Sequence, residues 1–158
     1  MHSATLRDGR TASIRKVGMQ DASRLENFVQ ALSPQARRQR FFGAVSTLSP
    51  HRLREMLAAP GLSLGAFGED GRIVAHAQYA LVGGQAEFAL VVDDGWQGKA
   101  LGEQLLSLLK RHARDAGARV LGGFMLADNQ AMRRLAAKLG FAQKYCADAT
   151  LLRFEAHA

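Results

Sequence analysis

Hydrophobic positions along the chain follow two spacings, which predicts a mixture of helices and strands. The first half holds one amphipathic helix after an N-cap at Asp21, with apolar residues every three or four positions: Leu25, Phe28, Val29 and Leu32. Ser33-Pro34 and Ser49-Pro50 each begin a further short helix. Apolar runs bounded by turn residues predict strands over 11–17, 62–67, 73–82, 88–92, 120–125, 141–145 and 149–154.

A long helix is expected from about Gly98 to Ala116, and another between Asn129 and Gly140. The element order is then strand, three short helices, three strands, helix, strand, helix and two strands. This order predicts an α+β fold with a mixed, mainly antiparallel central sheet and helices on both faces. At 158 residues the chain is long enough for one domain, so we expect residues 1–158 to form a single unit.

Composition narrows the class of protein. Apolar residues make up 47% of the chain and charged residues 22%, as in soluble globular proteins. The first ten residues lack the apolar core of a secretory signal, and no apolar run approaches 18 residues, so we expect a cytoplasmic protein without membrane contact. Cys146 is the single cysteine, which excludes an internal disulfide, and the scattered histidines predict no metal site.

The net charge of +7 permits a polyanionic partner. The arginines are dispersed, however, and groups such as Arg37, Arg38 and Arg40 lie on the polar sides of helical patterns, as solvated faces do. The sequence offers few aromatic residues for stacking on single strands and no clear recognition helix. Nucleic acid is therefore an unlikely partner, although a nucleic-acid-binding module remains an alternative.

The segment from Glu87 to Glu103, EFALVVDDGWQGKALGE, carries the clearest chemical signal. An apolar strand leads through a turn of small residues directly into a helix. The first N–H groups of a helix lack intrahelical partners and lie at the positive end of its dipole, so this arrangement binds phosphate groups. The loop matches neither GxxxxGK[ST] nor GxGxxG, which argues against a nucleotide triphosphatase and a dinucleotide-binding fold.

The loop Gln97-Gly98-Lys99-Ala100-Leu101-Gly102 resembles the acetyl-CoA loop of the GNAT N-acetyltransferases. A second GNAT-like segment follows one strand later, from Asn129 to Phe141. More narrowly, residues 32–42 and 86–106 look like the acetyltransferase domain of bacterial protein lysine acetyltransferases. The resemblance implies a GNAT fold and transfer of an acetyl group from acetyl-CoA to a primary amine, with a protein lysine as a candidate acceptor. It leaves open whether the chain is a monomer or a homodimer.

The resemblance also implies a set of residues at acetyl-CoA. The strand before the loop would pair with the pantetheine arm, the loop would hold the pyrophosphate, and Asn129 would contact either part or simply cap its helix. Lys99 would neutralise a phosphate or be solvated, and Arg133 and Arg134 would reach the adenosine 3′-phosphate or lie on a solvated face. The full set is Leu90, Val91, Val92, Gln97, Gly98, Lys99, Ala100, Leu101, Gly102, Glu103 and Asn129.

Glu87 is the candidate general base. A lysine amine is mostly protonated at pH 7, so its attack on a thioester benefits from a base. Glu87 opens the strand that leads to the loop. In this region of GNAT enzymes a glutamate often acts as the general base; the alternative is an exposed glutamate at a strand end. His76 is a second candidate base, or a satisfied residue of the sheet.

Two departures from the family pattern support a further alternative, a catalytically inactive sensor of acetyl-CoA. Ala100 stands where the family usually has glycine, which is costly if the residue has a positive φ. The tyrosine that protonates the leaving thiolate in many GNAT enzymes is missing near Ala136.

Overall fold

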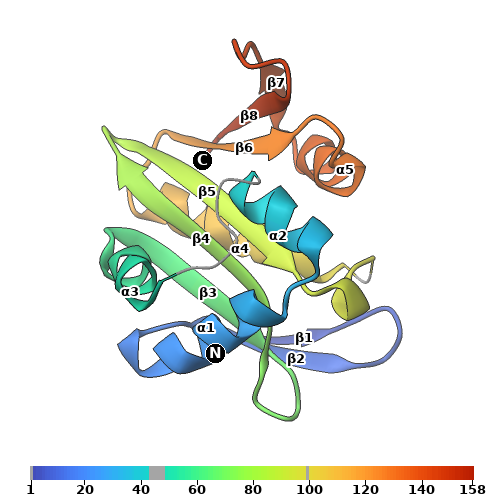
Figure 1. The fold of residues 1–158 in the computed structure, drawn as a ribbon. Helices are drawn as coiled ribbons and strands as arrows, with labels where there is room; N and C mark the ends of the chain where they lie inside the picture. Colours follow the sequence, from blue (N-terminus) through green and yellow to red (C-terminus); the bar gives the residue numbers. More distant parts are fainter. Residues whose placement is uncertain (1, 43–48, 99) are drawn as a thin grey trace.

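The computed structural model describes residues 2–42, 49–98 and 100–158 and places eight strands in one sheet (Figure 1). In spatial order, these strands are β1 (His2–Thr5), β2 (Thr11–Lys16), β3 (Gly61–Phe67), β4 (Ile73–Val82), β5 (Gln85–Val92), β6 (Val120–Leu126), β8 (Leu151–His157) and β7 (Ala142–Lys144). Neighbouring strands are antiparallel except β5 and β6, which are parallel. This sheet confirms the predicted α+β class with a mainly antiparallel sheet.

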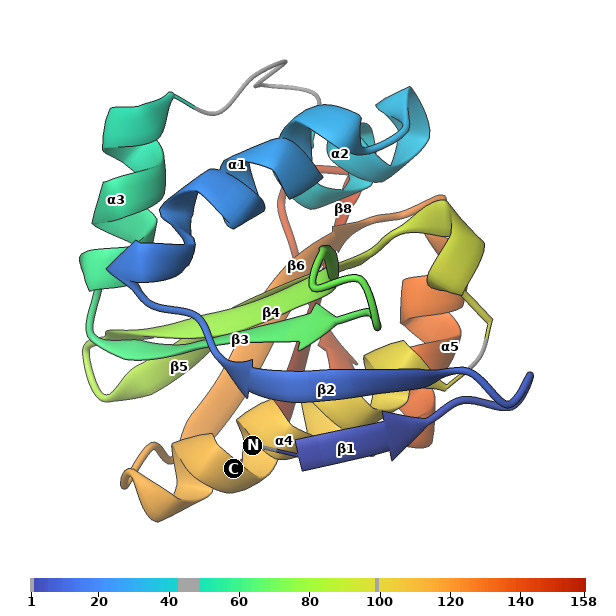
Figure 2. The same cartoon turned by 90° about the horizontal axis from the view of Figure 1, so that it is seen from below.

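Helices cover both faces of the sheet, as expected. α1 (Ala22–Ala31), α2 (Pro34–Phe41) and α3 (Pro50–Ala58) lie on one face, and α4 (Leu101–Asp115) and α5 (Gln130–Lys138) on the other (Figure 2). Each face has its own apolar core. In one core, Leu105 and Leu109 of α4 are buried with Tyr79 of β4. In the other, Leu25 of α1 and Leu53 of α3 are buried with Val91 of β5.

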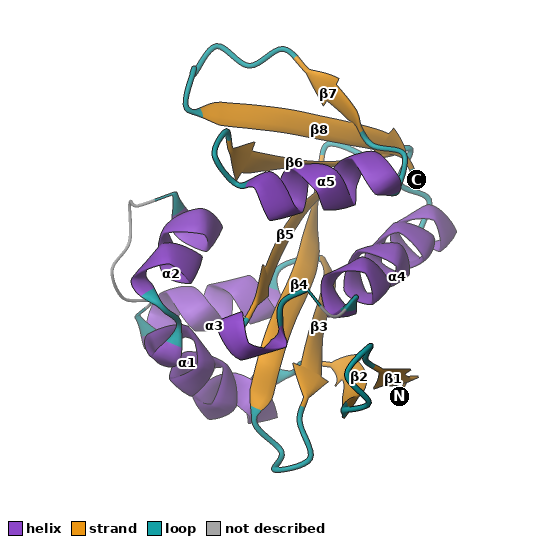
Figure 3. Cartoon of the chain, turned by 90° about the vertical axis from the view of Figure 1, so that its right-hand side faces the viewer, coloured by secondary structure: helices purple, strands orange, loops and turns teal. Residues whose placement is uncertain are grey.

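The sheet opens between β5 and β6. Their register joins only two residue pairs, Ala86 with Leu121 and Glu87 with Gly122, although β5 continues to Val92. In Figure 3, β6, β8 and β7 run across the direction of β3, β4 and β5. Beyond Glu87, the edge of β5 that faces β6 therefore lacks a partner strand in the described part of the chain.

The sequence missed two local features. β1 was not predicted, because its four residues HSAT carry no apolar run; it forms by pairing with β2 across a turn at residues 6–10. α4 begins at Leu101 rather than near Gly98, because a short 3-10 helix, η2 (Asp94–Trp96), and positive φ angles at Gly98 and Ala100 delay its start. Within the described residues, no helix has the length and apolarity needed to cross a membrane.

Candidate functional site

A groove of about 540 Å³ runs along the open end of β5, between the starts of α4 and α5. It brings together nearly all the residues that the sequence assigned to acetyl-CoA. Those that line it are Leu90, Val91, Val92, Gln97, Gly98, Ala100, Gly102, Glu103 and Asn129. Leu101 instead packs its side chain into the core and is 1% exposed. Lys99 lies outside the described residues.

Two helix N-termini converge on this groove. In α4 the first N–H to find a helical partner is that of Gln104, which donates to the Ala100 carbonyl, so the preceding N–H groups have no acceptor within the helix. At the start of α5, the Asn129 Oδ1 accepts a 3.2 Å hydrogen bond from the Met132 N–H. Asn129 is therefore a helix N-cap that also lines the groove.

Charged side chains reinforce the positive end of the groove. Arg7, Arg40 and Arg134 line it. Three acidic residues also line it: Glu103 pairs with Lys138 at 2.9 Å, Asp128 pairs with Arg38 at 3.2 Å, and Asp94 accepts a 3.4 Å hydrogen bond from Gln97 Nε2. Backbone donors, two helix dipoles and these cations together make the groove suitable for a polyanion.

The turn that leads into α4 has two residues in the left-handed region, Gly98 at φ 72° and Ala100 at φ 71°. The departure at Ala100 thus falls where a side chain is unfavourable, at a cost of about 1 kcal/mol. Gln97 holds the turn to the strand, because its Nε2 donates to the Val92 carbonyl at 2.9 Å. Trp96 is fixed from the other side by the Arg10 guanidinium, 4.0 Å from the ring centroid.

A smaller hollow of about 110 Å³ adjoins the groove and contains Glu87. The residues that line both spaces are Gln39, Arg40, Leu90, Asn129 and Met132. The outer wall of the hollow is apolar and includes two exposed aromatic rings, Phe42 (40% exposed) and Phe124 (43% exposed). Glu87 therefore lines a solvent-accessible hollow that adjoins the groove.

Glu87 is not a free glutamate at the end of a strand. Arg153 on β8 donates two hydrogen bonds to it, from Nη2 to Oε1 at 2.6 Å and from Nη1 to Oε2 at 2.9 Å. Arg153 also forms an ion pair with Glu155 at 3.2 Å. The hydrogen bonds that Arg153 donates to Glu87 are the main reason why the pKa of Arg153 is raised, so this guanidinium stays charged. Sequence patterns gave no signal for this pair, which joins strands 66 residues apart.

Arg40 differs from the solvated arginine that the helical pattern of α2 indicated. Its side chain is half-buried, lines both spaces, and has its pKa lowered to about 10 by burial. Its guanidinium lies 4.8 Å from the Phe41 ring, and no described residue forms a hydrogen bond or ion pair with it. A cation that lacks a polar partner at a pocket wall is available to a ligand.

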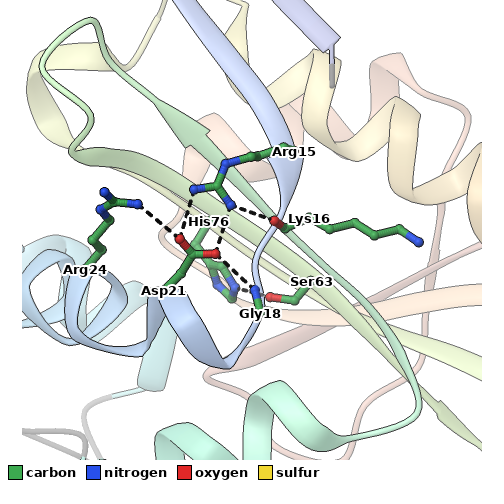
Figure 4. A network of polar contacts seen from close by, with 7 residues as sticks. All are labelled: Arg15, Lys16, Gly18, Asp21, Arg24, Ser63 and His76. Atoms are coloured by element: carbon green, nitrogen blue, oxygen red, sulfur yellow. Dashed lines mark hydrogen bonds and ion pairs between the residues drawn. The ribbon is translucent and has the colours of Figure 1, made fainter.

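The other candidates have structural partners. His76 is 2% exposed and shares a 2.7 Å hydrogen bond with the Ser63 hydroxyl (Figure 4), and burial lowers its pKa to about 3 with help from the charge of Arg40. It is a satisfied, neutral residue of the sheet. Arg133 donates to the Ala127 carbonyl, whereas Arg134 lines the groove.

No tyrosine lines the groove within the described residues. The Tyr79 hydroxyl and His112 Nδ1 share a 2.7 Å hydrogen bond beneath α4, and Tyr145 is 91% exposed on the strand pair β7–β8. Ala136, where the family places a tyrosine nearby, is fully buried. In the part of the chain that the structure describes, no three His, Cys, Asp or Glu side chains gather as metal ligands would.

Known proteins with the same features belong to one family. The model of the acetyltransferase (GNAT) family matches residues 27–141. Acetyltransferase PA5475 of Pseudomonas aeruginosa is 34% identical over 145 residues, which cover 87% of this chain and 78% of that protein.

Solved structures agree with this match. The GNAT domain of S. lividans PAT superposes with a TM-score of 0.91 and 26% identity, covering 99% of this chain and 96% of that one. PaiA N-acetyltransferase from Thermoplasma acidophilum, solved in complex with coenzyme A, has the same fold with a TM-score of 0.77 at 18% identity, over 93% and 99% of the two chains. The chain thus belongs to the GNAT family of acetyl-CoA-dependent N-acetyltransferases, enzymes that transfer an acetyl group to an amine.

Proposed function

We propose that the groove holds acetyl-CoA and that Glu87 acts as the base for a lysine side chain of an acceptor protein. The observation that carries this proposal is the junction of the two spaces, where Glu87 lies beside the end of a groove built for a polyanion. The donor and the acceptor would enter from opposite sides and meet there.

The residues of the groove fit acetyl-CoA in two ways. The edge of β5 beyond Glu87 has no partner strand among the described residues, so a pantetheine amide chain can add beside Leu90 to Val92 as strands do, although the Val92 carbonyl already accepts from Gln97. The N–H groups at the start of α4 then lie where a pyrophosphate is expected. Gly102 lines the groove at the start of α4, where a Cβ would make ordinary contacts with Leu135, Leu90 and Val92.

Acetyl-CoA supplies an activated acyl carbon whose bond to sulfur breaks as the bond to nitrogen forms. Glu87 takes the proton that the acceptor amine loses, directly or through one water. An ionised carboxylate has about four lone-pair sites, so the two donors from Arg153 leave acceptor capacity free. In the absence of a nearby tyrosine, the leaving thiolate takes its proton from solvent.

The shape of the smaller hollow favours a lysine side chain as acceptor. Its walls include Phe42, Phe124, Met125 and Met132, which suit an aliphatic stem, and Glu87 lies within reach of the amine that the stem carries. The exposed rings of Phe42 and Phe124 form an apolar surface that an acceptor protein can contact. The net charge of +7 also opposes encounter with a polycationic small amine.

The test is an assay of Glu87→Gln beside the wild type, against purified proteins, spermidine, aminoglycosides and free amino acids. We expect the variant to lose roughly 100-fold or more in kcat on protein lysines, while the stabilisation of its fold by acetyl-CoA is retained. Efficient transfer to a small amine and none to proteins would refute the acceptor. Near-wild-type turnover in Glu87→Gln would refute its role as the base.

A further inference from the structure

We propose that Arg153 is a positioning residue that holds Glu87 in place for catalysis, and that Gly122 creates the gap through which it does so. This inference rests on the proposed role of Glu87 as the base. Arg153 stands on β8, and β6 separates it from β5, so its side chain must cross a whole strand to reach Glu87.

The register of the sheet explains how the crossing is made. Glu87 of β5 pairs with Gly122 of β6, which in turn pairs with Glu155 of β8. A side chain on the middle residue would fill the path: a Cβ built on Gly122 would lie 2.5 Å from Arg153 Nη2 and 3.1 Å from its Cζ. Real Cβ atoms essentially never approach so closely, so a side chain here would force the guanidinium to move.

Arg153 is itself held rigidly. Glu155 accepts a 3.2 Å hydrogen bond from its Nε, the Phe124 ring centroid lies 4.8 Å from its Cζ, and only 15% of its side chain is exposed. The planar fork then presents two donors to the two oxygens of Glu87. A lysine could not reproduce this bidentate contact.

The location of the pair indicates catalytic positioning rather than stability alone. Glu87 and Gly122 form the last paired position before β5 and β6 separate. Glu87 lines the hollow, whereas Arg153 and Glu155 are absent from the described residues that line it. The guanidinium of Arg153 therefore binds the Glu87 carboxylate on the side away from the hollow. The opposite side of the carboxylate faces the hollow.

The charged groups around Glu87 come from two elements. Arg153 and Glu155 lie behind it on β8, and Arg40 of α2 lines the same hollow. On β4 its partner is Ala80, which carries no charge. Without Arg153, Glu87 would lose the two donors that fix its orientation, so removal of Arg153 should lower kcat rather than raise either KM.

The experiment measures kcat and both KM values of Arg153→Met, Arg153→Lys and Glu87→Gln on a protein acceptor. We expect Arg153→Met to lose roughly 10- to 100-fold in kcat, with both KM values and the melting shift with acetyl-CoA retained. Arg153→Lys should recover part of the rate. Arg114→Met removes an exposed arginine of α4 paired with Asp115 and should leave kcat unchanged.

A double-mutant cycle then tests the gap. Gly122→Ala should lower kcat much as Arg153→Met does, and the combined variant should be no slower than Arg153→Met alone. If the losses in kcat of the two single variants multiply in the combined variant, Gly122 does not act through Arg153, and the proposed role of Gly122 is wrong. Wild-type kcat in Arg153→Met, together with an inactive Glu87→Gln, would overturn the inference and leave the proposed function standing. Full activity in Glu87→Gln would overturn both.

Discussion

Two regions of the molecule satisfy their polar groups in opposite ways. Where β2 leads into α1, a buried carboxylate has all its hydrogen-bond partners within the protein. Asp21 is fully buried, accepts hydrogen bonds from Arg15 at 2.8 and 2.9 Å and from the Gly18 N–H at 3.1 Å, and is paired with Arg24 (Figure 4). This network joins the end of β2 to the start of α1.

On the side of β6, comparable groups remain open. Among the described residues, the edge of β5 beyond Glu87 lacks a partner strand and Arg40 lacks a polar partner. The first N–H groups of α4 lack acceptors within the helix. Ala100 also holds a left-handed conformation that a closed turn would avoid. The contrast indicates that the first region stabilises the fold, whereas the second keeps groups open for the ligand that we propose there.

The largest effect on stability is expected from Asp21→Asn. Arg15 lowers the pKa of Asp21 to about 2 from 3.8, so its contribution is present above pH 4 and is lost as the pH falls from about 4 to 2. The shift corresponds to about 2 kcal/mol. We expect the variant to melt about 5–8 °C lower at pH 7, with the difference from wild type shrinking in acid.

Asp70→Asn is the matched control for this variant. Asp70 pairs with Arg72 at 3.5 Å, but both side chains are mostly exposed, so the loss should be less than about 1 kcal/mol. Thermal melts across this pH range would measure both variants. Equal losses at the two sites, or a loss at Asp21 that persists unchanged at pH 2, would contradict the contrast between the regions.

A smaller effect of opposite sign is expected from Ala100→Gly. Relief of the left-handed strain outweighs the extra freedom of glycine in the unfolded chain, for a net gain of about 0.5–1 kcal/mol. The backbone N–H remains, so stabilisation by acetyl-CoA should be preserved.

Ala137→Gly in α5 provides the comparison, because it should lose about 0.5–1 kcal/mol. Chemical denaturation of the three proteins would compare their free energies of unfolding. A destabilised Ala100→Gly would mean that the turn is not strained.

Local periodicity was enough to predict most of the fold. The apolar spacing of α1 and α4, the turn residues around β4, and the N-cap at Asn129 all depend on neighbours within a few positions. The same holds for the loop before α4, whose small residues signal a phosphate site without knowledge of the sheet. The individual residues came from the resemblance to the GNAT family, and nine of them line one groove.

What the sequence could not predict depends on distant contacts. Arg40 and Arg153 look like ordinary surface cations in their own segments, and they differ only because α2 lies over β5 and because Gly122 leaves a path across β6. The short pairing of β5 with β6 is likewise a property of the sheet as a whole. The left-handed conformation of Ala100 follows from how the turn meets α4 and not from alanine's own preference.

The most direct test of the central claim measures melting temperature with and without acetyl-CoA in wild type, Gly102→Asp and Gln104→Asp. At a hundredfold excess over Kd, the wild type should gain about 2.7 kcal/mol, or roughly 5–10 °C. Gly102→Asp puts an anion into the groove at the start of α4 and should abolish the shift. Gln104→Asp puts the same charge on α4 outside the residues that line the groove and should keep it. An unmoved wild-type melt at millimolar acetyl-CoA, or a full shift in Gly102→Asp, would contradict the account.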